Sequence, residues 1–226
     1  MKEKTEVPKS LSFNEKKVIV SLCDHTGNWS RPYADDPAYE VVRIDRLDGQ
    51  DVRLLPYIDR PVHGILAAPP CTHFSGSGAC WWKAKGEKAV LEGMQVVDAC
   101  LRAVAVYRPV WWALENPVGR LPKWLGPWSW AFHPYEYGGY MLPGEKSFED
   151  RVFPEQDAYS KRTCIWGTAI KPIPKPVEPI WVTYTRSDGR TERDSPIHFC
   201  RGIKNRAQIR SVTPLGFARA FKEANP

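Results

Sequence analysis

The sequence lacks several features that would assign it to common classes of protein. No apolar run approaches the ~18 residues that a membrane-spanning helix needs, and the charged first residues do not resemble a secretory signal. None of its six cysteines pair at the C-x-x-C spacing of a zinc ribbon or redox site. Internal repeats and low-complexity segments are also missing. These absences predict a cytoplasmic protein with reduced thiols, without a structural metal and without a membrane partner.

The composition that is present suits a folded domain with a polyanionic partner. The chain has 226 residues, of which 42% are hydrophobic, and this is ample for a sizeable core. Its net charge of +6 favours DNA or RNA as a partner. We expect residues 1–16 to be a mobile tail, residues 17–170 and 201–226 to form the main domain, and residues 171–200 to form a proline-rich linker and a hairpin.

Strand-like and helix-like segments alternate along the main domain. A helical stripe over residues 87–107 should end before Pro109, and Thr213 with Pro214 should open a terminal helix. Four short apolar segments read as strands, at residues 18–22, 39–45, 64–68 and 110–114. This alternation predicts an α/β fold with a parallel sheet, helices on both faces and ligands at the carboxyl ends of the strands.

One stretch presents a thiol at such a strand end. The apolar run of residues 64–68 stops at Pro69-Pro70, and Cys71 follows at once. Because proline fixes φ and cannot continue a central strand, Cys71 should sit on a stiff loop at the sheet edge. Glu115-Asn116-Pro117 follows another predicted strand, so a carboxyl group should lie at a second strand end.

These motifs together resemble those of the cytosine carbon-5 DNA methyltransferases. Pro70-Cys71 with Phe74-Ser75 resembles the family's Pro-Cys-Gln-x-Phe-Ser loop, and Glu115-Asn116 resembles its Glu-Asn-Val motif. Arg162 is similar to the family's late arginine motif, and residues 210–214 are similar to its Arg-x-Leu-Thr-Pro segment. The compact form looks most like small bacteriophage or prophage members. The resemblance implies a Rossmann-like, S-adenosylmethionine-dependent methyltransferase fold with a reduced recognition appendage.

The resemblance also implies roles for individual residues. Cys71 would add to carbon 6 of a cytosine flipped out of double-stranded DNA, and Glu115 would hold the N3 and amino edge of the base. Asn116 would orient the loop, and Arg162 would hydrogen-bond the base carbonyl and lower the pKa of the thiol. The predicted S-adenosylmethionine site comprises Asp24, Gly27, Trp29, Asp45, Asp51 and Pro70. The predicted DNA contacts are Ser75, Arg186, Arg190 and Arg193.

The sequence departs from the family pattern at three places. Thr72 replaces the usual glutamine, Pro117 replaces the usual valine, and the loop at residues 23–27 lacks the usual Phe-x-Gly-x-Gly form. A separate target-recognition domain has no room in the chain, so the hairpin at residues 180–200 is the candidate remnant.

Other functions remain open from the sequence. A methylase-like protein that binds DNA or a host component without turnover would explain the altered loop. RNA or a free nucleotide could replace DNA as the acceptor. A thymidylate synthase also uses a Pro-Cys thiol, but there histidine follows the cysteine directly, whereas Thr72 intervenes here. An amino-methyltransferase is disfavoured because Ala68-Pro69-Pro70-Cys71 lacks the polar first and aromatic last residues of that loop. The oligomeric state is not predicted.

Overall fold

A computed structural model describes residues 16–148, 153–199 and 206–226. The predicted N-terminal tail therefore lies, apart from Lys16, outside the described residues. Within the described ranges, no helix has both the length and the apolar character needed to cross a membrane.

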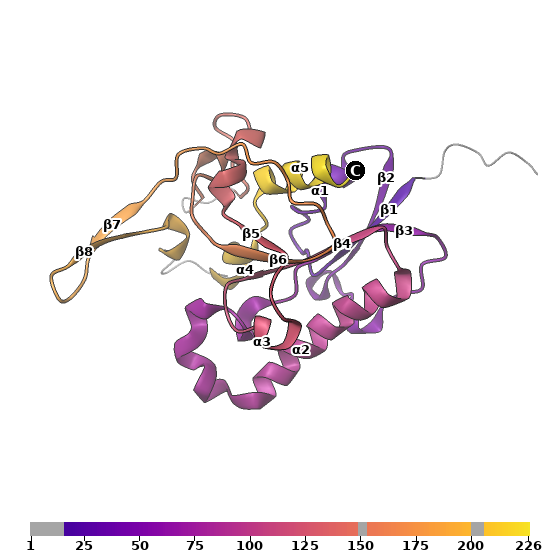
Figure 1. Cartoon of the computed structure of the whole chain (residues 1–226), viewed down its shortest axis with the longest axis horizontal. Coiled ribbons are helices and arrows are strands. Elements are labelled where there is room, and N and C mark those ends of the chain that lie inside the picture. The colour runs from indigo at the N-terminus through magenta and orange to yellow at the C-terminus, as the bar shows by residue number, and fades with distance from the viewer. Residues whose placement is uncertain (1–15, 149–152, 200–205) are drawn as a thin grey trace, which may run out of the picture.

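The centre of the fold is a six-stranded mixed sheet with the order β2-β1-β3-β4-β6-β5 (Figure 1). The strands are β1 (Lys17–Leu22), β2 (Tyr39–Ile44), β3 (Val62–Ala67), β4 (Trp111–Pro117), β5 (Trp130–Phe132) and β6 (Thr163–Gly167). The first four are parallel, as predicted, whereas β6 runs antiparallel to both β4 and β5. A parallel pairing of β5 would need another helical crossover, and between β4 and β5 the chain forms only the short helix α3 (Pro122–Leu125).

Helices cover both faces of the sheet, as the sequence predicts. Helix α2 (Trp82–Tyr107) lies on one face, and α1 (Arg31–Ala34) and α5 (Leu215–Ala224) lie on the other (Figure 1). Alternate residues of one strand therefore enter different cores: Val18 and Val20 pack in the α2 core, and Ile19 packs in the α5 core. Burial on both faces explains the continuous apolar runs of the central strands.

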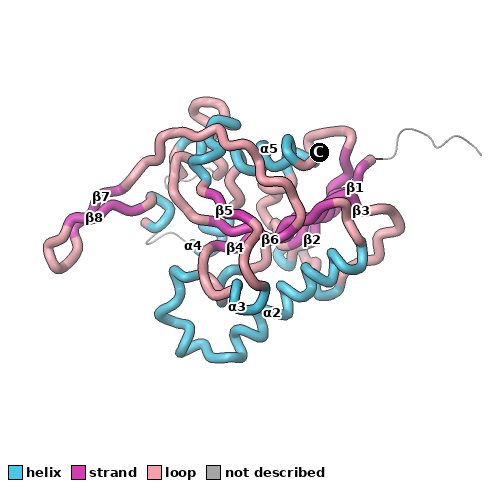
Figure 2. The backbone as a smooth tube through the Cα atoms, in the orientation of Figure 1, coloured by secondary structure: helices cyan, strands magenta, loops and turns pink. Residues whose placement is uncertain are grey.

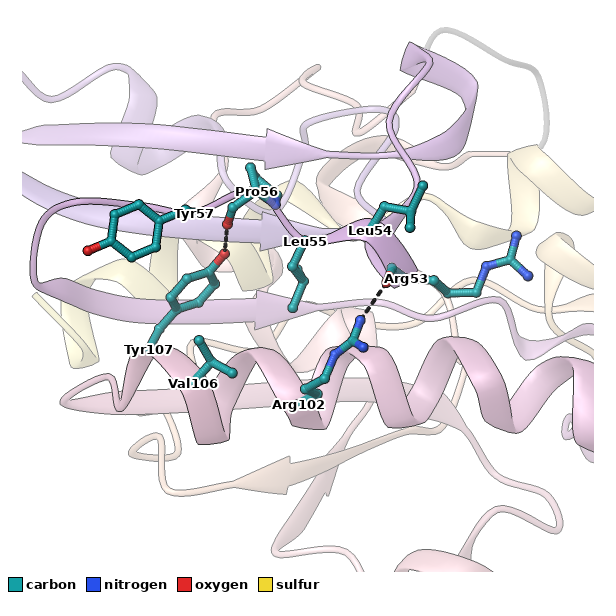
Figure 3. A pocket seen from close by; sticks show the side chains of 8 residues that line it. All are labelled: Arg53, Leu54, Leu55, Pro56, Tyr57, Arg102, Val106 and Tyr107. Carbon is teal, nitrogen blue, oxygen red and sulfur yellow. Dashed lines mark hydrogen bonds between the residues drawn. The ribbon is translucent and has the colours of Figure 1, made fainter.

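The ends of α2 are set by two residues with positive φ. Gly86 has φ +66° and interrupts the helix, so the regular helix with its apolar stripe begins at Glu87, as predicted. Arg108 has φ 49 and terminates the helix directly before Pro109. Arg102 and Tyr107, near the carboxyl end of α2, donate hydrogen bonds to the carbonyl oxygens of Arg53 and Pro56 (Figure 3). These bonds hold the β2–β3 connection around a cavity of about 330 Å³.

The start of α5 differs from the prediction. The helix begins at Leu215, and the residue before it is Pro214 in an extended conformation, so Thr213 does not cap it. Ser147 Oγ accepts a hydrogen bond from the amide of Leu215 (2.6 Å), and Asp157 Oδ2 accepts one from the amide of Gly216 (3.2 Å). Side chains from distant loops thus satisfy the free amides that a local threonine was expected to satisfy.

The described residues between 121 and 180 consist largely of loops and short helical turns outside α3, β5 and β6, as Figure 2 shows. The predicted linker is not free, however. The amide of Gly139 donates to Lys175 O (2.8 Å) and the amide of Val177 donates to Tyr135 O (2.9 Å), so the proline-rich segment is attached to the body. Beyond it, β7 (Val182–Thr185) and β8 (Thr191–Asp194) form the predicted hairpin, which we call the arm. The short helix α4 (Arg206–Ser211) precedes α5.

Candidate active site

Cys71 and Glu115 lie near the carboxyl ends of neighbouring parallel strands: Cys71 follows β3, and Glu115 lies within β4, two residues before its end. Ala67 of β3 pairs with Leu114 of β4, so the segments that continue from both strands lie side by side. Asn116 Nδ2 donates a hydrogen bond to Pro69 O at 2.9 Å, and the asparagine side chain is fully buried. This bond ties the proline turn before the thiol to the end of β4.

The loop that carries Cys71 is also bound along its length to the segment after β4. Gly76 N donates to Val118 O and Arg120 N donates to Phe74 O, both at 2.9 Å. Phe74 has no exposed surface and anchors the loop in the core beneath it. The loop is therefore stiff because a neighbouring segment pairs with it, in addition to its two prolines.

We expect Gly119→Ala to weaken this pairing. A Cβ atom on Gly119 would lie 1.9 Å from Phe74 O, so one of the two segments must move. The free energy of unfolding should fall by about 1–3 kcal/mol, as overpacked sites typically lose. Thermal unfolding followed by circular dichroism measures the change. Gly78→Ala is the matched control, because a Cβ atom there meets nothing within 4 Å. Equal melting temperatures for the two variants would contradict the close approach.

The thiol of Cys71 is half-buried and faces charged groups of both signs. Burial raises its pKa above the ordinary value, and the carboxyl group of Glu115 raises it further. The positive charges of Lys161 and Arg210 act in the opposite direction. The net direction is upward, so the thiol is mainly protonated at neutral pH without a ligand.

Glu115 is also shifted towards its neutral form. Burial raises the pKa of its carboxyl group, and the charge of Lys161 opposes this shift. Beside it, Oδ1 of the buried Asn116 has no partner among the described residues. The site thus contains a thiol, a carboxyl group inclined to hold a proton, and an amide oxygen free to accept a hydrogen bond.

The cation whose charge acts on the thiol is Lys161, whereas Arg162 was the residue predicted for this role. Lys161 Nζ donates to Arg210 O at 2.9 Å, and its charge acts on both Cys71 and Glu115. The guanidinium of Arg162 instead lies over the ring of Trp128, 5.7 Å from its centroid. Neighbouring residues of an extended segment point to opposite sides, so only one of these two cations can face the thiol.

Arg210 of α4 is a second cation that sequence reasoning did not place in the site. Its charge acts on Cys71, and its Nη2 lies 3.5 Å from Ser77 Oγ. Ser77 Oγ in turn lies 2.9 Å from Oγ of the half-buried Ser75, which was predicted to contact DNA. The signal for Arg210 was its place in a motif, but only the fold brings α4 to the Cys71 loop.

The predicted cofactor residues surround the point where the strand order reverses. From β1 the chain continues to β2 on one side, and β3 lies on the other side. In open α/β sheets, ligands bind in the crevice at the carboxyl ends of such strands. Here these ends carry the loop at residues 23–30 and the turn at Pro69-Pro70, and Pro70 is exposed.

Two residues of the first loop are internal. Trp29 has no exposed surface and packs against Phe217 and Phe221 of α5, so the structure places it in the core, without a surface for the predicted cofactor contact. Asp24 is 4% exposed, and its Oδ2 accepts hydrogen bonds from Ser21 Oγ, Ser30 Oγ and Ser30 N. Burial raises the pKa of this carboxyl group. Asp24 therefore holds the loop in shape.

The other predicted cofactor residues differ in whether neighbouring residues already engage their polar atoms. Gly27 has φ +68, and a Cβ atom there would lie 2.5 Å from Nη1 of Arg43, so the position requires glycine. Asp45 follows β2, and its Oδ1 accepts a hydrogen bond from Leu47 N at 2.8 Å. Asp51 uses both carboxylate oxygens on Arg53, which lowers its pKa to about 2.

The arginines of the arm are not equivalent. Arg186 pairs with Glu192 at 2.9 Å, and Arg190 pairs with Asp188 at 2.6 Å. The guanidinium of Arg193 lies 5.4 Å from the ring centroid of Trp181. Arg186 and Arg190 are thus neutralised within the arm, which weakens the prediction that they bind DNA, whereas Arg193 shows no acidic partner in the described structure.

Comparisons with known proteins identify no family. No protein-family model matches the chain, and no curated protein matches it. Among solved structures, it is similar to one described as a candidate DNA modification methyltransferase encoded within an E. coli prophage. The TM-score is 0.44 and the sequence identity is 16%, over 73% of this chain and 53% of that one. The chain thus spans about half the length of that protein, and a likeness this distant does not establish a shared activity.

Proposed function

We propose that the protein is a DNA methyltransferase that transfers a methyl group from S-adenosylmethionine to carbon 5 of cytosine. The observation that carries the proposal is the pair formed by Cys71 and Glu115 on neighbouring strand ends, joined by the bond from Asn116 to Pro69. A nucleophile, a proton-holding carboxyl group and a fixed loop are what this reaction requires, because carbon 5 of cytosine does not attack a methyl sulfonium unaided.

In the proposed reaction, Cys71 forms a bond from its sulfur to carbon 6 of the base. The electron pair of the 5,6 double bond then becomes available at carbon 5, which takes the methyl group. Loss of the carbon-5 proton to solvent and breakage of the sulfur–carbon bond restore the ring. The raised pKa of the free thiol implies that its proton leaves as the base enters the site, when Lys161 and Arg210 stabilise the developing thiolate.

Glu115 would act on the opposite edge of the base. Addition of the thiolate pushes negative charge onto N3, and a neutral carboxyl group can donate a hydrogen bond there. Burial of Glu115 favours this neutral form.

The residues at the reversal of strand order fit an adenosyl group in part. Asp45 lies at the end of β2, and only its Oδ1 is engaged by a described partner, so Oδ2 could bind ribose hydroxyls. Gly27 lies in the loop after β1 and the exposed Pro70 lies after β3, at the same edge of the sheet, whereas the side chains of Asp24 and Trp29 are buried. When bound there, S-adenosylmethionine would supply the electrophilic methyl group.

The role of Lys161 can be tested on the thiol itself. Lys161→Met removes a charge that lowers the pKa of Cys71, so this pKa should rise and alkylation by iodoacetamide should slow several-fold at pH 8. Mass spectrometry of the Cys71 peptide across a pH series measures the shift. Arg162→Met is the matched control and should leave the profile unchanged. A shift in the Arg162 variant and none in the Lys161 variant would reverse the assignment.

The decisive test of function uses labelled S-adenosylmethionine with double-stranded DNA, RNA and dCMP as separate acceptors. We expect label in DNA, recovered as 5-methylcytosine after digestion to nucleosides. Label in RNA alone, or in dCMP alone, would identify that molecule as the acceptor in place of DNA and leave the proposed reaction unchanged. Label in another nucleoside would reject the proposed reaction.

A methylase-like protein that binds DNA without turnover is the second candidate. The buried Trp29 and the enclosed carboxyl group of Asp24 favour it, because both are removed from the predicted cofactor contact. Isothermal titration with S-adenosylmethionine separates the two functions. Absence of binding, together with retained affinity for duplex DNA, would support this second candidate.

A further inference from the structure

The thiol of Cys71 stands at the start of a single helical turn. The carbonyl oxygen of Cys71 accepts hydrogen bonds from the amides of Phe74 and Ser75, both at 2.9 Å. The last carbonyl groups of a helical turn have no partner within the turn itself. Those of Thr72, His73 and Phe74 therefore depend on donors from other parts of the chain.

Two cationic residues supply these donors. Lys85, in the first turn of α2, donates from Nζ to Thr72 O at 2.9 Å. Arg120, after β4, donates from Nε to His73 O at 2.8 Å, and its main-chain amide donates to Phe74 O at 2.9 Å. Positive charge is favourable at the carboxyl end of a helical turn, because the negative ends of the peptide dipoles point there. The turn is thus fixed at its far end by two different elements.

The guanidinium of Arg120 is oriented by aromatic rings. It lies 4.7 Å from the ring centroid of Trp82 and 6.0 Å from that of Trp124, within the range of cation–π attraction. The ion pairs of the described residues do not include it, and its Nη2 is buried without a hydrogen-bond partner there. A planar guanidinium can lie against an indole ring and still direct Nε at a carbonyl oxygen, which an ammonium group cannot do. Stacking therefore aims Arg120 at His73 O.

We propose that Arg120 is a positioning residue that fixes the place from which Cys71 attacks the base. This role presupposes the proposed function, since it concerns the approach of sulfur to carbon 6. The loop that carries the thiol is held on both sides: Asn116 binds Pro69 O before the cysteine, and Arg120 binds two carbonyl groups after it. A displacement of about 1 Å at a reacting group can cost about 10²-fold in rate, so the second attachment matters for catalysis.

Steady-state methylation of duplex DNA tests the positioning role. Arg120→Met keeps an unbranched stem but loses the side-chain bond to His73 O, so kcat should fall about 10–100-fold. KM for DNA and its salt dependence should stay unchanged, because Arg120 binds protein groups. Arg120→Lys should restore kcat only in part. Lys123→Met removes an exposed cation from α3 and is the control, with unchanged kcat and KM.

Alkylation of Cys71 by iodoacetamide gives a second readout, which needs neither DNA nor cofactor. Burial raises the pKa of this thiol, so a loosened turn that exposes it should lower the pKa towards its ordinary value. In Arg120→Met, alkylation at pH 8 should therefore become several-fold faster while methyl transfer becomes slower. The buried Cys100 is the internal reference, because its alkylation increases only when the surrounding core opens.

The outcomes separate this role from the alternatives. A higher KM or a smaller salt dependence with unchanged kcat would show that Arg120 contacts DNA, and would overturn the inference. Unchanged kinetics and unchanged alkylation of Cys71 would also overturn it, as would equal acceleration at Cys71 and Cys100, which marks a general loss of structure. If Arg120→Met does not fold, as thermal unfolding shows, Arg120→Lys decides by the same readouts.

Failure of the proposed function gives a different result. If the wild-type protein transfers no label to DNA, the proposed function is rejected. The alkylation rates of Cys71 and Cys100 then still decide whether Arg120 positions the thiol.

Discussion

Replacing Cys71 with alanine is expected to abolish methyl transfer, with a loss of about 10⁴-fold or more, as removal of a nucleophile typically gives. Without the sulfur no adduct forms at carbon 6, and carbon 5 stays unreactive. Transfer of label from S-adenosylmethionine to duplex DNA measures the loss. The fold should survive, because Cys71 is half-buried and the loop is held mainly by Phe74 and the segment after β4.

A covalent trap makes this prediction specific to the thiol. DNA that contains 5-fluorocytosine cannot lose a proton from carbon 5, so the adduct should persist and migrate as a protein–DNA complex in a denaturing gel. The Cys71 variant should form no such complex. Cys80→Ala is the matched control, since Cys80 is exposed in the same loop region and should keep full activity. A Cys71 variant that still yields 5-methylcytosine would refute the mechanism.

Glu115→Gln should have the second-largest effect, a fall in kcat of about 10²–10³-fold, in the range lost with one transition-state donor. Glutamine keeps the shape of the side chain but cannot deliver a proton to N3. Steady-state kinetics with saturating DNA measure the change, and Glu87→Gln on the exposed surface of α2 is the control. Unchanged kcat in the Glu115 variant would remove this residue from the chemistry.

The pH dependence should carry the signature of both groups. Burial raises the pKa of Glu115, so its proton is retained above the range of an ordinary carboxyl group and is lost as the pH rises through that raised pKa. Cys71 must lose a proton to react, and its raised pKa moves that requirement upward. The rate should therefore rise towards alkaline pH through the thiol and fall as Glu115 ionises. The Glu115→Gln variant should not show the fall in rate that ionisation of Glu115 causes.

Local patterns were enough to predict the framework of the site. The end of β3 before Pro69 was predicted to within one residue because apolar runs and prolines act within a few residues, whereas β4 continues past Leu114 to Pro117, where it pairs with β6. The stripe of α2 and its end before Pro109 were correct for the same reason. The antiparallel β6, by contrast, follows a long irregular segment whose path no local pattern records.

The sequence by itself therefore determined that a thiol and a carboxyl group lie near the ends of two buried strands. It could do so because the spacing of apolar residues and the prolines that end a strand are local properties.

Tertiary structure alone decided which neighbours these groups have. A period of two predicts that Lys161 and Arg162 point to opposite sides, but packing decides that Lys161 faces the thiol. Strand pairing in the arm likewise brings Glu192 to Arg186, whereas Arg193 lies over Trp181. Trp29 entered the core because α5, almost two hundred residues later in the chain, supplies the aromatic rings against which it packs. The sequence thus determined which chemical groups the site contains. The fold determined which charges surround them, because electrostatics and packing act through space.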